Sequence, residues 1–543
     1  MKNEISNILK LISHGNTTKG LENAIALYNA NQNNLNVVKV LVYAFIQVGN
    51  FEKVILLLEE KFENLPEYQD FDYFNNMGYA KTQIEEFESG LLFLEKANQL
   101  NPAHPGPLTN LATTFQKMRL FDKAKFYVDK AIDAVLALGE DSYSYYTGVF
   151  LLQTEIYSAL NLDDNTIKIF NGILKKQFNE NIFYLLTTID AGKVSQDFVD
   201  QATKKLQRSS NDFSNNIQRF NFFTPLYFGL ANYFEKIDQK NSEYFFEKGN
   251  SEIFQSSRYN SFEYQKNILK SIDLFKEKYV GYSDENNNNG KENFFIVGAP
   301  RSGTTLIESI ITANEDVFPG GELNSFKFLV EKHIRMKSQN IEDFKNEIDS
   351  KYLKRTNFLR GDFKFIVDKL PENFLYLGFL TKLLPQAKVI RVIRNPWDIA
   401  ISLFKQRYVI NIPYSASFFN IGVFLANFEA VNRFWDQQAI SEQNILTIRY
   451  EDLVSNKTEH QKQLYSFLGI TSDYNEEKRQ RFSSPTDHNK QIRKNVNQSS
   501  IKKIGFESKK EEFYDALNSQ REYWINKGLI SKHDDFYGYL REI

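Results

Sequence analysis

Residues 294–305 read Phe-Phe-Ile-Val-Gly-Ala-Pro-Arg-Ser-Gly-Thr-Thr, and this stretch decides the fold of the carboxy-terminal half of the chain. The first four residues are a short apolar run of the kind that is buried in a parallel sheet. The helical pattern Leu-Ile-Glu-Ser-Ile-Ile follows at 306–311. A glycine-rich loop between a strand and a helix can surround a phosphate with backbone N–H groups, and the helix dipole adds about half a positive charge there. The stretch therefore predicts an α/β domain with a phosphate-binding loop.

The loop differs from the consensus GxxxxGK[ST] of nucleotide-hydrolysing families at one position. Thr304 stands where those families have the lysine that reaches the β- and γ-phosphates. A donor with one phosphate followed by a sulfate carries less terminal charge than a triphosphate, so it needs neither that lysine nor necessarily Mg²⁺. The hydroxyls of Thr304 and Thr305, with the N–H groups of Ser302 and Gly303, are sufficient for its 5′-phosphate.

Two further apolar runs are predicted to be strands of the same sheet. The run 389–393 leads into Arg394, and a helix is expected to begin near Pro396. Arg394 offers a planar fork for two phosphate oxygens, and Ser402 lies about two helical turns further on, so both side chains can face one site. The other run, 445–453, contains Tyr450.

Two ionisable residues are candidates for the chemistry. Glu322 follows Phe-Pro-Gly-Gly at 318–321, and Lys369 ends the short predicted strand that begins at Phe365. Residues at the carboxyl ends of strands reach the ligand crevice of an open α/β sheet. A carboxylate can deprotonate an acceptor, and an ammonium group can stabilise a charge that develops on a leaving oxygen.

The sequence Pro-Arg-Ser-Gly-Thr-Thr after a strand resembles the 5′-phosphosulfate loop of sulfotransferases, specifically the tyrosylprotein and tetratricopeptide-repeat-containing sulfotransferases. The later motifs follow in that family's order. The resemblance implies an α/β sulfotransferase domain of the P-loop type, with a parallel sheet and helices on both faces. It also implies PAPS as the sulfuryl donor, PAP as the product, a hydroxyl-bearing acceptor and no metal.

The same resemblance implies roles for individual residues. Glu322 matches the general base, and Lys369 the transition-state lysine. Arg301, because it lies inside the phosphate loop, is a candidate for a second electrostatic contributor to the sulfate, with a structural role in the loop as the alternative. Arg394 and Ser402 match the residues that bind the 3′-phosphate. Tyr450 matches a residue that lines the nucleotide site.

A segment near the carboxyl terminus resembles the part of the family that closes over the donor. It contains the basic run 490–494 and the hydroxyl-rich run 499–505. Ser500 is the best match to the serine that supports the reaction, with Ser499 and Lys502 as alternatives. Glu322 is followed by Leu-Asn-Ser-Phe and lacks the second hydrogen-bonding pair of the animal tyrosylprotein enzymes, so tyrosine as the acceptor stays open.

The amino-terminal half shows an internal repeat. Residues 74–97 align with 108–131 at a spacing of 34, with apolar and small residues on matching helical faces. This pattern resembles the tetratricopeptide repeat, whose stacked helix pairs form a solenoid with a concave face for peptides or partners. A weaker copy spans 38–62, and degenerate copies are expected at 1–30 and 145–180. The stretch 227–250, with the helix-forming residues that continue to Tyr279, is expected to close the solenoid.

The length of the chain indicates how many domains carry these motifs. A chain of 543 residues exceeds what one hydrophobic core usually supports. We therefore expect a helical-repeat domain at 1–282, a polar linker at 283–293 and the sulfotransferase domain at 294–543.

The formal net charge is −2, which argues against nucleic acid as a partner. No apolar stretch is long enough to span a membrane, and the absence of cysteine fits a reducing compartment, so a cytoplasmic location is expected.

Several alternatives stay open at this point. The first is a Mg²⁺-dependent nucleotide phosphotransferase with a related loop, and the second is an inactive transferase domain on a repeat scaffold. For the amino-terminal half, the alternative is an irregular helical domain whose apolar pattern is ordinary core. The sequence does not specify the acceptor, which can be a peptide or protein held by the repeats. It does not specify the oligomeric state either, and a homo-oligomer is one option.

Overall fold

The structure is a computed structural model that describes residues 1–14, 16–62, 69–139, 142–143, 145–209, 212–213, 216–256, 259–282, 287–336, 340–408, 412–438, 444–471, 473–480, 504–533 and 535–537. Its contacts divide the chain into two compact units, Met1–Leu226 and Tyr227–Ile543. The division falls inside one helix, α13 (Asn216–Phe234). Each unit is described by itself below.

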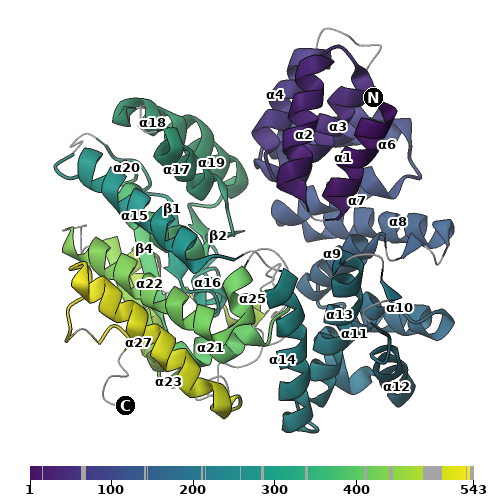
Figure 1. Ribbon diagram of the computed structural model, residues 1–543. Coiled ribbons are helices and arrows are strands. Elements are labelled where there is room, and N and C mark those ends of the chain that lie inside the picture. Colours follow the sequence, from purple (N-terminus) through teal and green to yellow (C-terminus); the bar gives the residue numbers. More distant parts are fainter. Residues whose placement is uncertain are drawn as a thin grey trace. The chain divides into compact units, whose positions relative to one another are not determined.

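The first unit is all-helical over its described residues (Figure 1). Its helices before α13 are α1 (Lys2–Ser13), α2 (Thr17–Ala30), α3 (Leu35–Gln47), α4 (Phe51–Phe62), α5 (Phe71–Gln83), α6 (Phe87–Leu100), α7 (Pro105–Lys117), α8 (Phe121–Leu138), α9 (Thr147–Ala159), α10 (Asp163–Lys176), α11 (Glu180–Asp190), the 3₁₀ turn η3 (Ala191–Lys193) and α12 (Gln196–Lys205). Apolar side chains from consecutive helices, such as those of α1 to α5, share one continuous core.

Helical hairpins repeat along this unit. A residue with positive φ lies between the helices of four successive pairs, at Gly49, Glu85, Arg119 and Asn161. Glu85 and Arg119 are 34 residues apart, so the hairpins α5–α6 and α7–α8 confirm the repeat spacing read from the sequence. Inside α5–α6 the helices touch at glycine, because a Cβ on Gly78 would lie 2.9 Å from the backbone nitrogen of Leu94.

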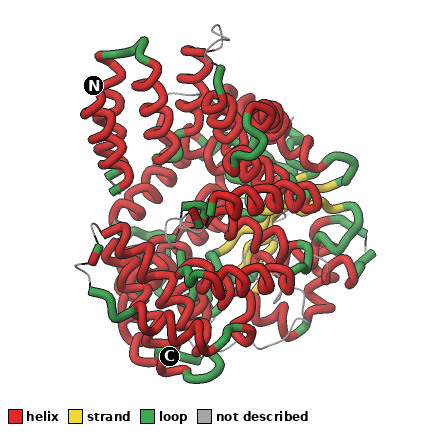
Figure 2. Tube along the Cα trace, turned by 90° about the vertical axis from the view of Figure 1, so that its right-hand side faces the viewer, coloured by secondary structure: helices red, strands yellow, loops and turns green. Residues whose placement is uncertain are grey.

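The second unit is built on a five-stranded sheet whose neighbouring strands are all parallel. The strands are β1 (Asn293–Gly298), β2 (Val317–Gly321), β3 (Phe365–Asp368), β4 (Lys388–Ile393) and β5 (Ile445–Arg449), and their spatial order is β2-β3-β1-β4-β5. β1 is therefore the central strand, with β3 on one side and β4 on the other. Figure 2 shows the strands surrounded by helices.

Helices cover both faces of the sheet, as predicted. The described helical elements are α14 (Gln239–Ser256), α15 (Ser261–Lys278), α16 (Thr304–Ile311), α17 (Ser325–Met336), α18 (Ile341–Glu347), the π-helix η5 (Ile348–Leu353), α19 (Lys354–Arg360), η6 (Pro371–Tyr376), α20 (Leu377–Leu383), α21 (Pro396–Phe404), η7 (Pro413–Ala416), α22 (Phe418–Gln437), α23 (Tyr450–Ser455), α24 (Lys457–Leu468), α25 (Glu476–Gln480), η10 (Glu507–Lys509) and α27 (Lys510–Asn526). Figure 1 shows α27 lying along α22, with which it packs.

Alternation along β1 explains the two covered faces, since successive strand residues point to opposite sides. Phe294 and Ile296 share a core cluster with side chains of α16 and α24. Phe295 packs instead against Phe326 of α17 and Tyr352 of η5, with ring centroids 5.9 Å apart in both pairs. Every residue of β1 is buried, as the apolar run predicts.

The stretch 227–279 differs from its expected place at the end of the solenoid. Helices α14 and α15 belong to the same compact unit as the sheet. Asn250 of α14 donates a hydrogen bond to the carbonyl of Phe404 at 2.7 Å, and Phe275 of α15 meets Trp435 of α22 edge-on at 5.0 Å. The limits of the independently folding domains stay a prediction.

Two local features of the second unit also differ from expectation. In the polar run 283–293, the described residues 287–293 are tied to the sheet unit: Asn287 donates to the carbonyl of Leu383 at 3.1 Å, and Asn289 donates to Asp349 at 2.7 Å. Amide hydrogen bonds, rather than apolar burial, order these residues. The predicted strand 445–453 ends at Arg449, because Tyr450 begins α23.

No helix among the described residues of either unit has the length and apolar character required to cross a bilayer.

Candidate active site

The predicted site residues lie at the carboxyl edge of the sheet. Glu322 directly follows β2, Lys369 follows β3, Arg394 follows β4 and Tyr450 follows β5. The glycine-rich loop 299–303 follows the central strand β1. Because parallel strands end at the same edge, the fold places residues from five separate sequence segments at one edge of the sheet.

The loop after β1 is a tight turn with two residues of positive φ. Arg301 has φ +71° and Gly303 has φ +106°, and Gly303 caps the amino terminus of α16. A Cβ built on Gly303 would lie 2.3 Å from Cδ2 of the Tyr450 ring, so glycine is required both by the dihedral and by the close ring. Ser302 is fully buried, and its hydroxyl has no hydrogen-bond partner among the described residues.

Two arginines and a serine converge beside this loop. Arg301 Nε donates to Ser402 Oγ of α21 at 3.0 Å, and Arg394 Nη1 donates to the carbonyl of Arg301 at 3.0 Å. The guanidinium of Arg394 also lies over the Tyr450 ring, 4.3 Å from its centroid. The structure thus brings together the residues that the sequence analysis assigned to the 3′-phosphate and the nucleotide, and joins them to the loop.

Burial dominates the electrostatics of Arg394. The residue is 5% exposed, and its burial lowers the pKa of the guanidinium from the ordinary value, although Tyr450, Asp398 and Glu451 favour the charged form. A carboxylate oxygen of Asp398 lies 4.0 Å from Arg394 Nη2. A buried cation at this position is suited to an anionic ligand, whose charge would replace the lost hydration.

Glu322 and Lys369 form an ion pair at the ends of β2 and β3. Lys369 Nζ lies 2.5 Å from Glu322 Oε1; the lysine side chain is 2% exposed, whereas that of the glutamate is 41% exposed. The pair therefore has one buried member and one member that a ligand from solvent can reach.

An irregularity in β2 sets the position of Glu322. The register between β2 and β3 shifts between Pro319 and Gly321. A Cβ on Gly320 would lie 2.5 Å from the carbonyl oxygen of Val367, so the two strands can approach only with glycine there. Lys369 N donates to the carbonyl of Gly321 at 2.7 Å, which fixes the two strand ends next to each other.

A second ion pair, which the sequence analysis did not single out, lies beside the first. Lys327 of α17 pairs with Glu372 of η6. These residues come five positions after Glu322 and three after Lys369, so the same two segments are joined twice. Burial lowers the pKa of Lys327, but the nearby carboxylates of Glu372, Glu331 and Glu322 outweigh it and raise the pKa overall. The sequence does contain a signal for this pair. Each of the two residues that follow a strand, Glu322 and Lys369, is followed by a helix with a charged residue in its first turn.

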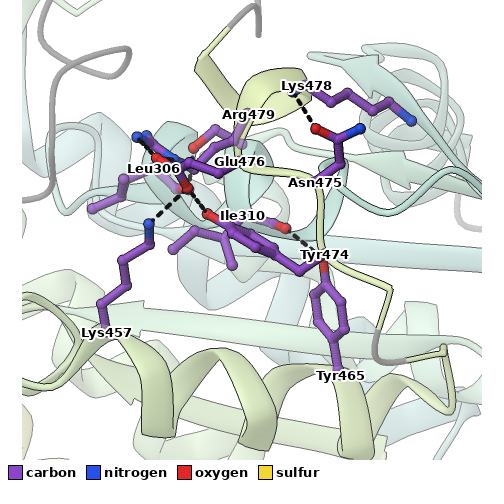
Figure 3. A network of polar contacts seen from close by, with 10 residues as sticks. Leu306, Ile310, Lys457, Tyr465, Tyr474, Asn475, Glu476, Lys478 and Arg479 are labelled. Atoms are coloured by element: carbon purple, nitrogen blue, oxygen red, sulfur yellow. Dashed lines mark hydrogen bonds and ion pairs between the residues drawn. The ribbon is translucent and has the colours of Figure 1, made fainter.

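A polar network joins α25 to α24, and α24 in turn bonds to α16, the helix that follows the loop (Figure 3). Glu476 accepts hydrogen bonds from Arg479 Nε at 2.9 Å and Lys457 Nζ at 3.0 Å, and from the Tyr474 hydroxyl. Tyr465 donates to the carbonyl of Ile310 in α16 at 2.9 Å. Although burial raises the pKa of Glu476, these donors outweigh it and hold the pKa well below the ordinary value.

Glu476→Gln is therefore expected to lower the Tm by about 2 °C at pH 7. Because the folded pKa is depressed, the carboxylate stabilises the fold above its unfolded pKa of about 4.5, and this stabilisation is lost as the pH falls towards the folded pKa. Thermal unfolding at pH 7 and at pH 3 measures the difference between variant and wild type. Glu511→Gln, at an exposed position of α27, is the control. A difference that stays constant between the two pH values would contradict this role.

Some expected site residues lie outside the described part of the chain. Ser499, Ser500 and Lys502 and the basic run 490–494 are in the undescribed segment 481–503, so their roles stay predictions. Among the described residues, no group of three or more His, Cys, Asp or Glu side chains could hold a metal ion.

Comparisons with known proteins bear on this unit. Residues 293–475 match the model of the sulfotransferase family. An uncharacterised protein from Aquifex aeolicus is 28% identical over 278 residues, which are 47% of this chain and 36% of that protein. The chain thus matches about a third of the length of this curated relative.

Two solved structures of sulfotransferases are similar to part of this chain. One is the sulfotransferase domain from the Synechococcus PCC 7002 olefin synthase, with a TM-score of 0.28 and 16% identity over 44% of this chain and 97% of that domain. The other is a sulfotransferase from Alicyclobacillus acidocaldarius, with a TM-score of 0.27 and 15% identity over 43% of this chain and 95% of that protein.

The parallel sheet, the loop after its central strand and the match of the family model agree with one another. Residues 293–475 are a sulfotransferase-family domain.

Proposed function

We propose that this domain transfers a sulfuryl group from PAPS to a hydroxyl acceptor by in-line displacement. The observation that carries the proposal is the arrangement at the carboxyl edge of the sheet. The contacts of Arg301, Arg394 and Ser402 join the β4 side of the sheet to the loop, and the pair Glu322–Lys369 lies on the β3 side. An in-line displacement needs a donor-binding group on one side of the transferred group and a base on the other.

The residues of the loop fit the donor. The orphaned hydroxyl of buried Ser302 and the N–H groups at the start of α16 are donors for a 5′-phosphate. The Tyr450 ring lies directly against Gly303 and forms a wall beside the loop. Buried Arg394, with Arg301 and Ser402, would hold a 3′-phosphate. When bound, PAPS supplies an activated sulfuryl group whose leaving oxygen belongs to a phosphate.

Each residue of the Glu322–Lys369 pair has its own task in this proposal. The exposed carboxylate of Glu322 accepts the proton of the acceptor hydroxyl. The buried ammonium group of Lys369 stabilises negative charge on the leaving oxygen, more strongly in the transition state than in the ground state. Arg301 adds positive charge from the loop, and Ser500 is proposed to support the same oxygen.

We further propose that the helical hairpins of the first unit are tetratricopeptide repeats that recruit the acceptor or a partner protein. Stacked hairpins expose a continuous surface to a ligand, which is how repeat proteins commonly bind. A cytoplasmic location and the presence of a homo-oligomer stay predictions.

Transfer of label from radiolabelled PAPS tests the enzymatic proposal. Pools of small hydroxyl compounds, oligosaccharides and tyrosine peptides are incubated with the full chain, and labelled products are separated. Label in at least one pool is expected, whereas transfer to none of them would leave the domain as a scaffold.

Gly303→Ala is expected to weaken PAP binding at least tenfold. A methyl group at φ +106° and 2.3 Å from the Tyr450 ring forces the loop or the ring to move. Gly469→Ala is the matched control, because Gly469 also has a positive φ, +66°, but has open space around its Cβ position. Calorimetric titration with PAP measures both variants. Equal affinity of Gly303→Ala and wild type would show that the loop does not hold the donor.

A further inference from the structure

A fully buried glutamate lies in the helix that follows the donor loop. Glu308 of α16 is 0% exposed. Its neighbours in the same helix belong to the apolar core of the sheet unit, and they are Ile307, Ile310 and Ile311. A glutamate is almost never fully buried unless its carboxylate has partners, because the loss of hydration is costly. The apolar core supplies no such partner, so the partner has to come from a polar group of another segment.

The end of β2 supplies a partner. The Gly321 N–H donates a hydrogen bond to Glu308 Oε1 at 3.2 Å, and this bond is buried. The strand is irregular at this point, since Gly321 has φ +68° and the register with β3 shifts between Pro319 and Gly321. A regular parallel ladder would offer this N–H to a carbonyl of β3. Glu308 therefore provides an acceptor for an amide at an irregular strand end.

Gly321 is held from two sides, and both contacts lead to the proposed catalytic pair. Its carbonyl accepts from Lys369 N at 2.7 Å, and its N–H donates to Glu308. Glu322 is the next residue, so the orientation of the Gly321 peptide determines where the Glu322 side chain leaves the sheet. Glu308 thus connects the base to α16, the helix that begins at the donor loop.

The helix α16 is itself well fixed. It begins at Thr304, about one helical turn before Glu308. The Tyr465 hydroxyl donates to the carbonyl of Ile310 at 2.9 Å, and the Thr312 hydroxyl donates to the carbonyl of Glu308 at 2.8 Å. A side chain on a packed helix can hold a neighbouring segment more accurately than a side chain on a loop can.

We infer that Glu308 is a positioning residue, which holds the Gly321 amide and so sets the place of the Glu322 carboxylate relative to the donor loop. The inference rests on the proposed function and deepens it, because in-line displacement requires the base and the donor to be aligned. Glu308 acts through Glu322 in this assignment.

The test uses two substitutions at Glu308 and one control in the same helix. Glu308→Met keeps a long side chain but removes the acceptor, whereas Glu308→Gln keeps an acceptor oxygen and removes the charge. Ser309→Ala is the matched control, because the hydroxyl of this buried residue donates at 2.7 Å to the carbonyl of Leu306, within α16, and not to β2.

Three measurements are made on each full-length protein. Hydrogen–deuterium exchange of the segment 317–323 reports on the Gly321 amide. Calorimetric titration gives the Kd for PAP. The third measurement is the rate of label transfer from saturating PAPS to the same pools of small hydroxyl compounds, oligosaccharides and tyrosine peptides.

Glu308→Met is expected to speed the exchange of the Gly321 amide by at least about tenfold, since this N–H loses its acceptor. It is expected to slow transfer by roughly 10- to 100-fold, because the base is no longer aligned. The Kd for PAP is expected to change less than about threefold. Glu308→Gln and Ser309→Ala are expected to stay within about threefold of wild type in all three measurements.

The double variant distinguishes a positioning role from a merely structural one. If Glu308 acts through Glu322, adding Glu308→Met to Glu322→Gln is expected to slow transfer by less than about threefold more, because the base is already absent. An equal loss in the presence and in the absence of the Glu322 carboxylate would overturn the inference.

Other results would also count against the inference. Unchanged exchange at Gly321 in Glu308→Met, or a loss of PAP affinity in parallel with the rate, would refute it. Transfer by Glu308→Gln as slow as that by Glu308→Met would show that the charge matters rather than the acceptor. If Glu308→Met does not fold, Glu308→Asp, which withdraws the carboxylate by one methylene group, replaces it with the same expected results.

Failure of the proposed function has a different outcome. Faster exchange at Gly321 in Glu308→Met, together with no transfer by wild type, would refute sulfuryl transfer and would still support Glu308 as the residue that holds the Gly321 amide.

Discussion

Lys369→Ala is expected to reduce kcat for sulfuryl transfer by about 10²–10³-fold, the loss seen when one preorganised donor to a developing charge is removed. The Lys369 side chain is 2% exposed and is held against Glu322 at the ends of two adjacent strands. Such a fixed ammonium group requires little reorganisation when charge develops on the leaving oxygen. The Kd for PAP is expected to change less than about threefold, because a transition-state interaction contributes little to binding of the product.

The control for this change is Lys364→Ala. Lys364 immediately precedes β3, is 67% exposed and pairs with Asp316 at 2.8 Å. Its removal is expected to leave kcat and PAP affinity unchanged. Single-turnover transfer and calorimetry with PAP separate the two quantities. If Lys369→Ala lost PAP affinity in parallel with activity, Lys369 would be a donor-binding residue rather than a transition-state residue.

Glu322→Gln is expected to reduce kcat by about 10²–10⁴-fold, since proton transfer by a positioned base contributes that much. The amide keeps the size of the side chain and can still accept a hydrogen bond from Lys369, but it cannot take the proton of the acceptor. The Glu322 side chain is 41% exposed, so the amide itself stays hydrated, whereas the buried ammonium group of Lys369 keeps a hydrogen bond but loses its paired charge.

Glu315→Gln is the control for that variant. Glu315 precedes β2, has a side-chain exposure of 69% and pairs with Lys478 at 3.3 Å. It is expected to be active at the wild-type rate. Rates with saturating labelled PAPS and a common acceptor test both variants, and a Glu322→Gln protein with wild-type kcat would remove Glu322 from the role of base.

The parts of the fold that could be predicted from the sequence are those that a local sequence pattern specifies without ambiguity. A buried parallel strand is a short apolar run, and the runs of β3 and β4 are each followed by a charged residue at the carboxyl edge of the sheet. That reading located β1, β3 and β4, and placed Lys369 and Arg394 at strand ends. The repeat in the first unit was equally readable, because a 34-residue spacing reflects one pair of helices.

The features that were missed depend on contacts between distant segments. Lys327 and Glu372 are 45 residues apart and become partners only because β2 and β3 are neighbours in the sheet. The packing of α15 in the sheet unit depends on the contact between Phe275 and Trp435. These residues are far apart in the sequence, so no local pattern predicts their contact. For Asn287 and Asn289, low hydrophobicity predicted a linker, but their amides make hydrogen bonds that composition does not reveal.

We propose that the loop at 298–305 binds a phosphosulfate donor rather than a nucleoside triphosphate. It rests on Thr304 in place of the lysine of nucleotide hydrolases and on buried Arg394 beside the loop. Calorimetric titration of the full chain with PAP and with ATP, each with and without Mg²⁺, tests it most directly. We expect tight PAP binding that Mg²⁺ does not change and ATP binding that is at least tenfold weaker. Preferential, Mg²⁺-dependent binding of ATP would contradict it and would indicate a phosphotransferase instead.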